Sequence, residues 1–319
     1  MLKTTPTLSD INAAHSRIKP HINRTPILTS QTFNTLFSTN IYFKCENFQK
    51  AGAFKSRGAI NVVFSLDDKS AEKGVCTHSS GNHAQALARA AQLRNIPSYI
   101  VMPSNAPQVK VDAVREYGGI ISFCEPNLAA RESTLLKVQS ESSAFEVHPY
   151  NNYDIIAAQA SATKELFEDI DVDLDIILCP VGGGGLLSGT ALAKHFLNKT
   201  TKLIACEPLG ADDAYKSFIK GEIIPSVNPN TIADGLLTSL GTLNFPIIQN
   251  YVDDIVTVTE ENIRKAMKLV YERMKIIIEP SSAVPLAAIL EGKVEVKNKN
   301  IGIIISGGNV DLSNLSFGK

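Results

Sequence analysis

The sequence predicts an α/β protein built from two units, each a largely parallel sheet covered by helices. From residue 71 to 149, short apolar runs alternate with helical patterns, as in a small parallel sheet with crossover helices. The C-terminal half repeats this alternation with further apolar runs. A chain of 319 residues also exceeds what one hydrophobic core usually fills. Together these observations favour two domains.

The first unit divides into strand-like and helix-like segments in a regular order. The expected strands are 74–79, 97–103, 120–125 and 144–149, and the expected helices between them are 82–95, 108–118 and 130–142.

The C-terminal half carries strand-like runs at 175–181, 202–208, 253–259 and 300–306. A helix is expected from Thr259, with Glu260 in the first turn, where an acid interacts favourably with the helix dipole. Its predicted apolar face consists of Ile263, Ala266, Met267, Val270 and Met274.

The first ~70 residues are too few for an independent core. They contain an expected helix opened by Ser9 and a strand at 41–46, with no partner sheet of their own. We therefore predict that residues 1–70 and 150–319 form one large domain and that 71–149 is a small domain inserted in it.

Composition excludes several classes of protein. Lys plus Arg is 31 and Asp plus Glu is 32, so the net charge of −1 provides no general attraction for nucleic acid or an anionic membrane. The first ten residues lack the apolar core of a signal peptide, and no apolar run approaches the ~20 residues of a membrane span. The cysteines form no CxxC pair and mostly lie in apolar runs, which favours a reducing, cytoplasmic location and argues against structural zinc. They are Cys45, Cys76, Cys124, Cys179 and Cys206.

Lys55 stands out within AGAFKSRGA, residues 51–59, because no Asp or Glu occurs between Glu46 and Asp67. Like charge from Lys50 and Arg57, together with desolvation, is expected to favour its neutral amine, which is a nucleophile that can form a Schiff base. Most single lysines are solvated surface charges, so this interpretation needs support from elsewhere in the chain.

Four consecutive glycines, Gly182 to Gly185, follow an apolar run and precede a helical pattern that begins at Leu186. Such a loop lets backbone N–H groups converge at a helix N-terminus and predicts a phosphate site. A flexible loop is the plain alternative. A dinucleotide site is a rival, because Glu207 ends the next strand about twenty residues on.

A second strand-to-helix loop, THSSGNHAQAL, contains Ser79, Ser80, Gly81, Asn82 and His83. Its N–H groups and hydroxyls suit an anion such as a carboxylate, although Ser80 or Asn82 could instead only cap the helix. A third strand ends in Ser306, Gly307 and Gly308, where a plain turn and a close approach to a ligand are both open.

These segments, in order, resemble the fold type II (tryptophan synthase β-like) enzymes that use pyridoxal 5′-phosphate, and within them the serine racemase and serine/threonine dehydratase group. The resemblance covers nearly the whole chain. It rests on TPILTS, FKCENFQKAGAFKSRGA, THSSGNHAQAL, VGGGGLLSG, EPLGADD, IADG, VDDIVTVTEE, ERMKIIIEPSSA and ISGGNVD.

The resemblance implies roles for matching positions in binding the cofactor. Lys55 corresponds to the Schiff-base lysine, Phe54 lies against the cofactor ring, and Asn82 bonds its phenolic oxygen. Ser306 meets the pyridine nitrogen. The phosphate is held by Gly182, Gly183, Gly184, Gly185 and Leu186. In this family the large domain binds the cofactor and the small domain gates the substrate.

Two serines narrow the expected chemistry. A hydroxyl at Ser306 cannot supply the charge that an aspartate gives the ring nitrogen, so the cofactor is a weaker electron sink, which suits α-proton exchange or β-elimination better than transamination. Ser80 stands where many threonine dehydratases of the group have alanine, and it offers a second acid/base on the face of Cα opposite Lys55.

The resemblance also implies substrate and metal sites. The amino-acid carboxylate is expected at Ser79, Ser80, Asn82 and His83, with Arg131 as a further contact. Glu207, the carbonyl of Ala211 and Asp213 match a divalent-cation site, for which oxygen ligands suit Mg²⁺, Ca²⁺ or Mn²⁺. The alternative is that Asp213 simply opens a helix.

Two departures from the animal enzymes remain open. Tyr150 follows His-Pro where they have asparagine, a pattern closer to fungal and bacterial relatives and to hydroxyaspartate dehydratases. Gln31 and Ala51 differ from the serine and threonine expected where ATP binds, so ATP stays a candidate effector.

The leading hypothesis is a cytoplasmic, homodimeric serine racemase that also eliminates water from serine. A 3-hydroxyaspartate or threonine/serine dehydratase is the alternative, and a non-catalytic nucleotide-binding α/β protein is a remote one.

Overall fold

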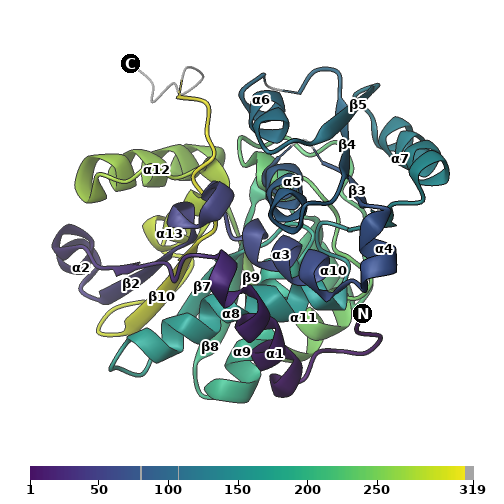
Figure 1. The fold of residues 1–319 in the computed structure, drawn as a ribbon. Coiled ribbons are helices and arrows are strands. Elements are labelled where there is room, and N and C mark those ends of the chain that lie inside the picture. Colours follow the sequence, from purple (N-terminus) through teal and green to yellow (C-terminus); the bar gives the residue numbers. More distant parts are fainter. Residues whose placement is uncertain (80, 107, 313–319) are drawn as a thin grey trace.

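The computed structural model describes residues 1–79, 81–106 and 108–312 (Figure 1). Within these ranges the strands form a six-stranded sheet, in the order β1-β2-β10-β7-β8-β9, and a four-stranded sheet, in the order β5-β4-β3-β6. The strands of the larger sheet are β1 (Ile27–Leu28), β2 (Asn40–Cys45), β7 (Ile176–Pro180), β8 (Lys202–Pro208), β9 (Asp254–Val258) and β10 (Asn300–Ile305). Those of the smaller sheet are β3 (Val75–His78), β4 (Ser98–Pro103), β5 (Ile120–Cys124) and β6 (Phe145–Glu146).

The two sheets are almost entirely parallel, as the alternating pattern predicts. Only the pairing of β1 with β2 is antiparallel among the described strands. Strand β2 pairs along its length with β10, with Ile41 opposite Ile301. The first 45 residues therefore share a sheet with the last strand of the chain, and the α/β fold class is confirmed.

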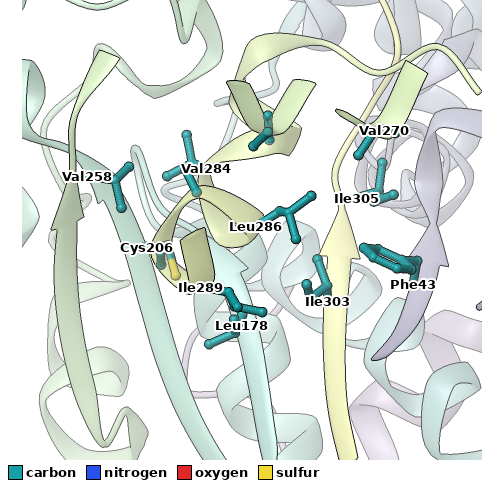
Figure 2. Close-up of a cluster of buried hydrophobic side chains, with 14 of the residues drawn as sticks. Phe43, Leu178, Cys206, Val258, Val270, Val284, Leu286, Ile289, Ile303 and Ile305 are labelled. Carbon is teal, nitrogen blue, oxygen red and sulfur yellow. The ribbon is translucent and has the colours of Figure 1, made fainter. Parts of the chain in front are cut away.

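Helices cover both faces of the larger sheet. One face packs against α2 (Gln31–Phe37), α12 (Glu260–Met274) and α13 (Pro280–Leu290). Figure 2 shows the core on this side, where Val284, Leu286 and Ile289 meet Leu178 and Ile303 of the sheet. The other face packs against α1 (Leu8–Ile18), α8 (Tyr153–Asp169), α9 (Gly185–Leu197), α10 (Asp213–Lys220) and α11 (Phe245–Tyr251).

The smaller sheet also has a helix layer on each side. Helices α3 (Lys55–Ser65), α4 (Asp68–Glu72), α5 (Asn82–Arg94) and α6 (Gln108–Glu116) share a core with one face. Helix α7 (Leu128–Ser142) covers the other face through Leu135 and Val138. In the part of the chain described, no helix combines the length and apolar character required to cross a membrane.

The sequence predicted the start of one helix correctly and misplaced the start of another. Thr259 caps α12 as predicted, its side chain accepting from Asn262 N. The first helix, however, begins at Leu8 and not at Ser9: Thr7 Oγ1 accepts from Asp10 N at 3.3 Å while Asp10 Oδ2 accepts from Thr7 N at 2.8 Å. This reciprocal capping box satisfies two backbone donors and outcompetes a cap two residues later.

Candidate active site

Lys55 is the first residue of α3, and neutral groups surround its amine. Its Nζ donates to the backbone oxygen of Pro149 at 2.8 Å. The same atom lies 5.0 Å from the ring centroid of Phe54 and 6.0 Å from that of Tyr150. An aromatic, hydrogen-bonded pocket of this kind holds the amine in one place without forming an ion pair.

Burial lowers the pKa of Lys55 from 10.5 to about 8, against a smaller upward effect of the Glu279 carboxylate. The neutral amine is therefore accessible near neutral pH. The sequence-based expectation that Lys50 and Arg57 add like-charge repulsion is wrong. Arg57 is fully buried and hydrogen-bonded to Glu46 and other partners, so its charge is compensated where it stands.

The glycine run forms the turn between β7 and α9. Gly184 has φ +92°, a conformation that strains any residue with a side chain, and it directly precedes the first residue of α9. A Cβ on Gly183 would lie 2.4 Å from the ring of Tyr150, so the backbone approaches that ring as only glycine allows. The loop thus presents unpaired N–H groups at the start of a 13-residue helix, next to the residue that also flanks Lys55.

Asn82 is oriented by a chain of hydrogen bonds that joins the start of α5 to loops of the larger domain. Its Nδ2 donates to both carboxylate oxygens of Glu279 at 2.9 Å, and its Oδ1 accepts from Asn309 Nδ2 at 2.9 Å. Asn309 Nδ2 also donates to Ala51 O at 2.8 Å. Because a backbone carbonyl can only accept, the direction of the chain is fixed, and Asn82 keeps its N–H groups on the Glu279 side.

His83 follows Asn82 in α5 and is held as a neutral imidazole. Its Nε2 donates to Val147 O at 2.9 Å, and burial with the nearby Lys55 charge lowers its pKa to about 3. Its Nδ1 is buried and has no partner. Since the ring's one proton is used on Val147, this side chain can accept a hydrogen bond but cannot donate one to a carboxylate.

The structure describes two of the three remaining residues that are predicted to bind the carboxylate. Ser79 follows β3, with its Oγ accepting from Gly81 N at 3.3 Å. Ser80 lies outside the described residues. Arg131, in α7, has its Nε buried without a partner and lies near His78 at the end of β3. An unpartnered guanidinium N–H beside this loop is suited to an anionic group.

Ser306 directly follows β10 and lies against the Lys55 turn. Its backbone oxygen accepts from Phe54 N at 3.0 Å, and Ala53 forms a bridge with Gly307. The buried Oγ of Ser306 lies 2.9 Å from Ser282 Oγ. The ends of β7, β10 and β3 therefore bring the three predicted loops around Lys55, as expected at the carboxyl edge of parallel sheets.

The candidate metal ligands lie together at the end of β8. Ala211 closes a short 3₁₀ turn, and Asp213 begins α10. Burial raises the pKa of Asp213 to about 6 against a smaller lowering effect of the nearby Ser226 hydroxyl, and no donor meets its two buried carboxylate oxygens in hydrogen-bond geometry. Burial raises the pKa of Glu207 to about 8. The buried carboxylate of Asp213, beside the buried carboxyl of Glu207, fits a hard divalent cation, and oxygen donors suit Mg²⁺, Ca²⁺ or Mn²⁺.

The geometry at Glu207 also bears on the dinucleotide alternative. In that alternative the acid would accept from a ribose hydroxyl. Here Glu207 is fully buried, and its two oxygens accept from Ala214 N at 2.9 Å and Tyr215 N at 2.8 Å. The carboxylate is thus turned into the start of α10 and away from such a ligand.

Comparison with known proteins decides the family. Residues 18–307 match the family model described as pyridoxal-phosphate dependent enzyme. The chain belongs to this family. It is 53% identical over 312 residues to the beta-hydroxyaspartate dehydratase of Paracoccus denitrificans, covering 98% of this chain and 99% of the relative. It is 52% identical over 316 residues to the serine racemase of Dictyostelium discoideum, covering 98% and 97%. Its fold matches the structure of maize serine racemase with a TM-score of 0.94 at 45% identity, over 97% of this chain and 95% of that one.

Membership of the pyridoxal-phosphate family confirms the predicted resemblance and fold class, and it makes this chain an enzyme of the racemase and dehydratase group. The residues present fit the family's cofactor. Lys55 offers an amine of lowered pKa for an aldehyde, and the glycine loop at α9 offers backbone N–H groups for a phosphate.

The structure places three further residues at the candidate site, to which the motifs gave no role. Glu279 and Asn309 orient Asn82, and Pro149 supplies the carbonyl that receives the Lys55 amine. Glu279 lies in the EPSSA segment and Asn309 in ISGGNVD, so the motifs contained both. Their role depends on contacts across about 200 residues, which spacing along the chain does not reveal.

Proposed function

We propose that this protein is a pyridoxal-phosphate-dependent serine racemase that interconverts L- and D-serine and also converts serine to pyruvate and ammonia by β-elimination. The single observation that carries the proposal is the Lys55 amine, whose pKa is lowered to about 8, between aromatic rings and next to the glycine loop. The 52% identity to a serine racemase supports the choice of reaction.

The bound cofactor supplies an aldehyde that bonds the amino acid and a ring that withdraws electrons from Cα. Lys55 would take or return the α-proton on one face of Cα. Ser80 would serve the opposite face, since inversion requires a proton group on each side. Phe54 packs against the ring.

The chain's own polar groups would fix the cofactor. Backbone N–H groups of Gly182, Gly183, Gly184, Gly185 and Leu186 would hold the phosphate at the start of α9. Asn82, which donates to both oxygens of Glu279 in this structure, would turn one N–H to the phenolic oxygen, and the Ser306 hydroxyl would meet the ring nitrogen. A hydroxyl in place of a carboxylate there leaves the ring a weaker electron sink. This favours reactions that need only a short-lived carbanion at Cα, such as α-proton exchange.

The substrate carboxylate would lie at the loop of Ser79, Ser80, Asn82 and His83. Because the imidazole proton of His83 is already donated to Val147, the contact there is through backbone N–H groups at the start of α5 and not through the ring. The unpartnered Nε of Arg131 would be a further donor.

A divalent cation, Mg²⁺ or else Ca²⁺ or Mn²⁺, is proposed at Glu207, Ala211 and Asp213. The support is the pair of unpartnered oxygens of Asp213 and the raised pKa of both carboxyl groups, which a bound cation would reverse.

We further propose a cytoplasmic homodimer in which 1–70 and 150–319 form the cofactor-binding domain and 71–149 forms a small domain that gates the substrate. Strands β3 to β6 fall within the small range and all others outside it, in support of the division. ATP is a candidate effector near Ala51. A hollow of about 410 Å³ beside it is lined by Asn47, Gly52, Lys275 and Asn309, among others.

A dedicated 3-hydroxyaspartate dehydratase is the second candidate. Tyr150, which packs on Gly183 and over Lys55, stands where animal serine racemases have asparagine. The relative from Paracoccus denitrificans is a beta-hydroxyaspartate dehydratase. A threonine/serine dehydratase is a variant of this candidate.

The test compares turnover of L-serine, D-serine, L-threonine and 3-hydroxyaspartate by one preparation, with chiral analysis and pyruvate or keto-acid release. The proposal expects D-serine from L-serine at a rate comparable with elimination. Efficient turnover of 3-hydroxyaspartate with no inversion of serine would make the second candidate correct. A protein that never turns yellow with pyridoxal phosphate would contradict both.

A further inference from the structure

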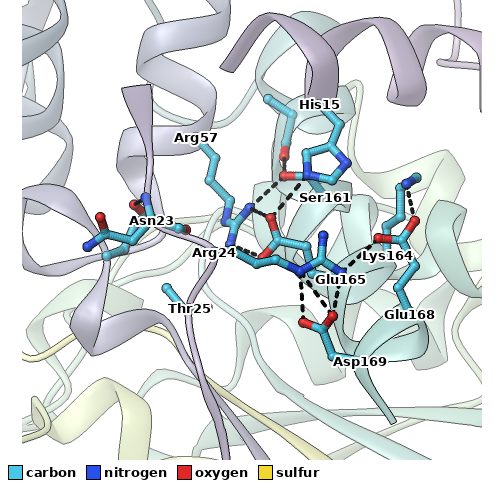
Figure 3. Close-up of polar contacts among 12 residues, drawn as sticks. His15, Asn23, Arg24, Thr25, Arg57, Ser161, Lys164, Glu165, Glu168 and Asp169 are labelled. Atoms are coloured by element: carbon cyan, nitrogen blue, oxygen red, sulfur yellow. Dashed lines mark hydrogen bonds and ion pairs between the residues drawn. The ribbon is translucent and has the colours of Figure 1, made fainter. Parts of the chain in front are cut away.

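A cluster of charged side chains lies beneath the Lys55 turn, on the side away from the proposed cofactor. Its members are each at most 1% exposed: Arg57 of α3, Lys44 of β2, Glu46 directly after β2, and Glu165 of α8. Figure 3 shows Arg57 together with Glu165 and Ser161 of α8. A buried cluster of four full charges is costly unless every member is paired and hydrogen-bonded.

The guanidinium of Arg57 uses all five of its N–H donors. Its Nε and Nη2 donate to Glu46 at 2.7 and 2.8 Å, and its Nη1 and Nη2 donate to Glu165 at 2.8 and 2.7 Å. The remaining hydrogen of Nη1 goes to Ser161 Oγ at 3.0 Å. Because this planar fork is bound by Glu46 after β2 on one side and by Glu165 and Ser161 of α8 on the other, it has one position open to it, which an ammonium on a flexible stem would not have.

The partners of Arg57 are themselves satisfied. Glu165 also accepts from His15 Nε2 at 3.1 Å and pairs with Lys44 Nζ at 2.8 Å, while Glu46 accepts from Thr25 Oγ1 at 2.6 Å. Two carboxylates balance one guanidinium and one ammonium. The cluster is therefore neutral as a whole and rigid in its parts.

Arg57 follows Lys55 by two residues, so the two side chains leave α3 roughly 200° apart around its axis. Lys55 faces the pocket, and Arg57 faces the body of the larger sheet. Contacts on the Arg57 side continue at Gly58, where a Cβ would lie 2.6 Å from Gln159 Nε2 of α8. The first turn of α3 has no acid and no side-chain cap of its own, so its position depends on such tertiary contacts.

We propose that Arg57 is a positioning residue: its buried fork, held by Glu46, Glu165 and Ser161, fixes the first turn of α3 and thereby the reacting amine of Lys55. The inference rests on the function proposed above, because it concerns the amine that would bond the cofactor. The effect is geometric. A shift of about 1 Å in a reacting group can cost ~10²-fold in rate.

The test uses Arg57→Lys, which keeps the buried positive charge but loses the fork. A matched control is Lys194→Met, which removes the Lys194 amine that lies 2.6 Å from Asp253 in another part of the larger domain. Each protein is compared with wild type well below its own melting temperature.

For Arg57→Lys, kcat with L-serine should fall ~10²-fold with KM within about twofold of wild type, as expected for a displaced reacting group. The rate at which pyridoxal phosphate enters the apo-protein at Lys55, trapped with borohydride and located by peptide mass, should fall ~10-fold or more. The midpoint of the pH dependence of that rate should not move, because the charge is kept. Lys194→Met should lower only the melting temperature.

If Arg57→Lys fails to fold, Ser161→Ala removes one acceptor and leaves both ion pairs, and it should lower both rates about fivefold. The proposal is overturned if the folded Arg57 variant, or Ser161→Ala in its place, matches Lys194→Met in kcat and in cofactor entry. Cofactor entry requires no amino acid, so it tests the positioning role of Arg57 even where serine is the wrong substrate. A wild type that never labels at Lys55 would overturn the proposed function as well.

Discussion

Two cationic side chains on opposite faces of the first turn of α3 have opposite surroundings. Lys55 faces neutral groups, a carbonyl and two aromatic rings, and its pKa falls to about 8. Arg57, two residues later, is buried among two carboxylates and a hydroxyl that accept hydrogen bonds from all five of its N–H groups. The contrast shows how one turn can contain a reactive amine beside a full charge: the charge is compensated on the far side of the helix, and the amine is only desolvated.

The largest expected effect on turnover comes from removing the amine of Lys55. Lys55→Ala should abolish racemisation and elimination of serine while leaving the melting temperature close to that of wild type, since the cluster below the turn is untouched. Lys50→Ala, which removes an exposed lysine five residues earlier, is the control and should stay active. Substantial turnover by Lys55→Ala without an added amine would refute the assignment.

Ser80→Ala tests whether the pocket has a second proton group opposite Lys55. Racemisation of serine should fall by the ~10²–10⁴ that a positioned proton donor contributes. Elimination from L-serine should suffer much less, because Lys55 alone can remove that α-proton, whereas elimination from D-serine should fall with racemisation. Wild-type racemisation by Ser80→Ala would reduce Ser80 to a helix cap and make the protein a dehydratase.

At the proposed metal site, burial raises the pKa values of two acids, whereas at Lys55 it lowers the pKa of an amine. A chelator should lower the melting temperature and activity, and Mg²⁺ at about a hundred times its Kd should restore ~2.7 kcal/mol of stability. Asp213→Ala should remove this response, and Asp212→Ala, whose partner is Lys216, should keep it. An unchanged melting curve with and without chelator would remove the site from the account.

The same site has a predicted pH dependence. Asp213 and Glu207 have pKa values raised to about 6 and about 8, so a falling pH protonates them and competes with the cation. The stabilisation by Mg²⁺ should therefore be full above pH 8 and largely lost below pH 6. A stabilisation that does not change across this interval would contradict the ligand assignment.

How much the sequence could predict follows the same division between the two faces. The Lys55 pocket is built from local motifs, and these indicated the lysine, the glycine loop and Ser306. The sequence presented Arg57 only as a nearby like charge, because its partners Glu46 and Glu165 are 11 and 108 residues away. Glu279 likewise meets Asn82 across 197 residues. Spacing identifies groups that one loop presents together, but not partners that the fold supplies from elsewhere.

The smallest expected effect is on stability and comes from an exposed cation, Arg24, in contrast to the buried Arg57. Arg24 pairs with Glu168 and Asp169 close to the buried cluster, but its side chain is 46% exposed. Exposed ion pairs contribute about 0–1 kcal/mol, so Arg24→Ala should shift the free energy of unfolding by no more than that in urea titration and leave kcat unchanged. A loss comparable to that of Arg57→Lys would show that the cluster extends to the surface.

The most direct test of the central claim follows the α-hydrogen of L-serine during turnover by the holoenzyme in deuterium oxide. We expect D-serine that carries deuterium at Cα, formed alongside pyruvate, and neither product with Lys55→Ala. Pyruvate without any D-serine would contradict the racemase assignment and leave a dehydratase. D-serine formed equally well by Lys55→Ala would contradict the role of the lysine itself.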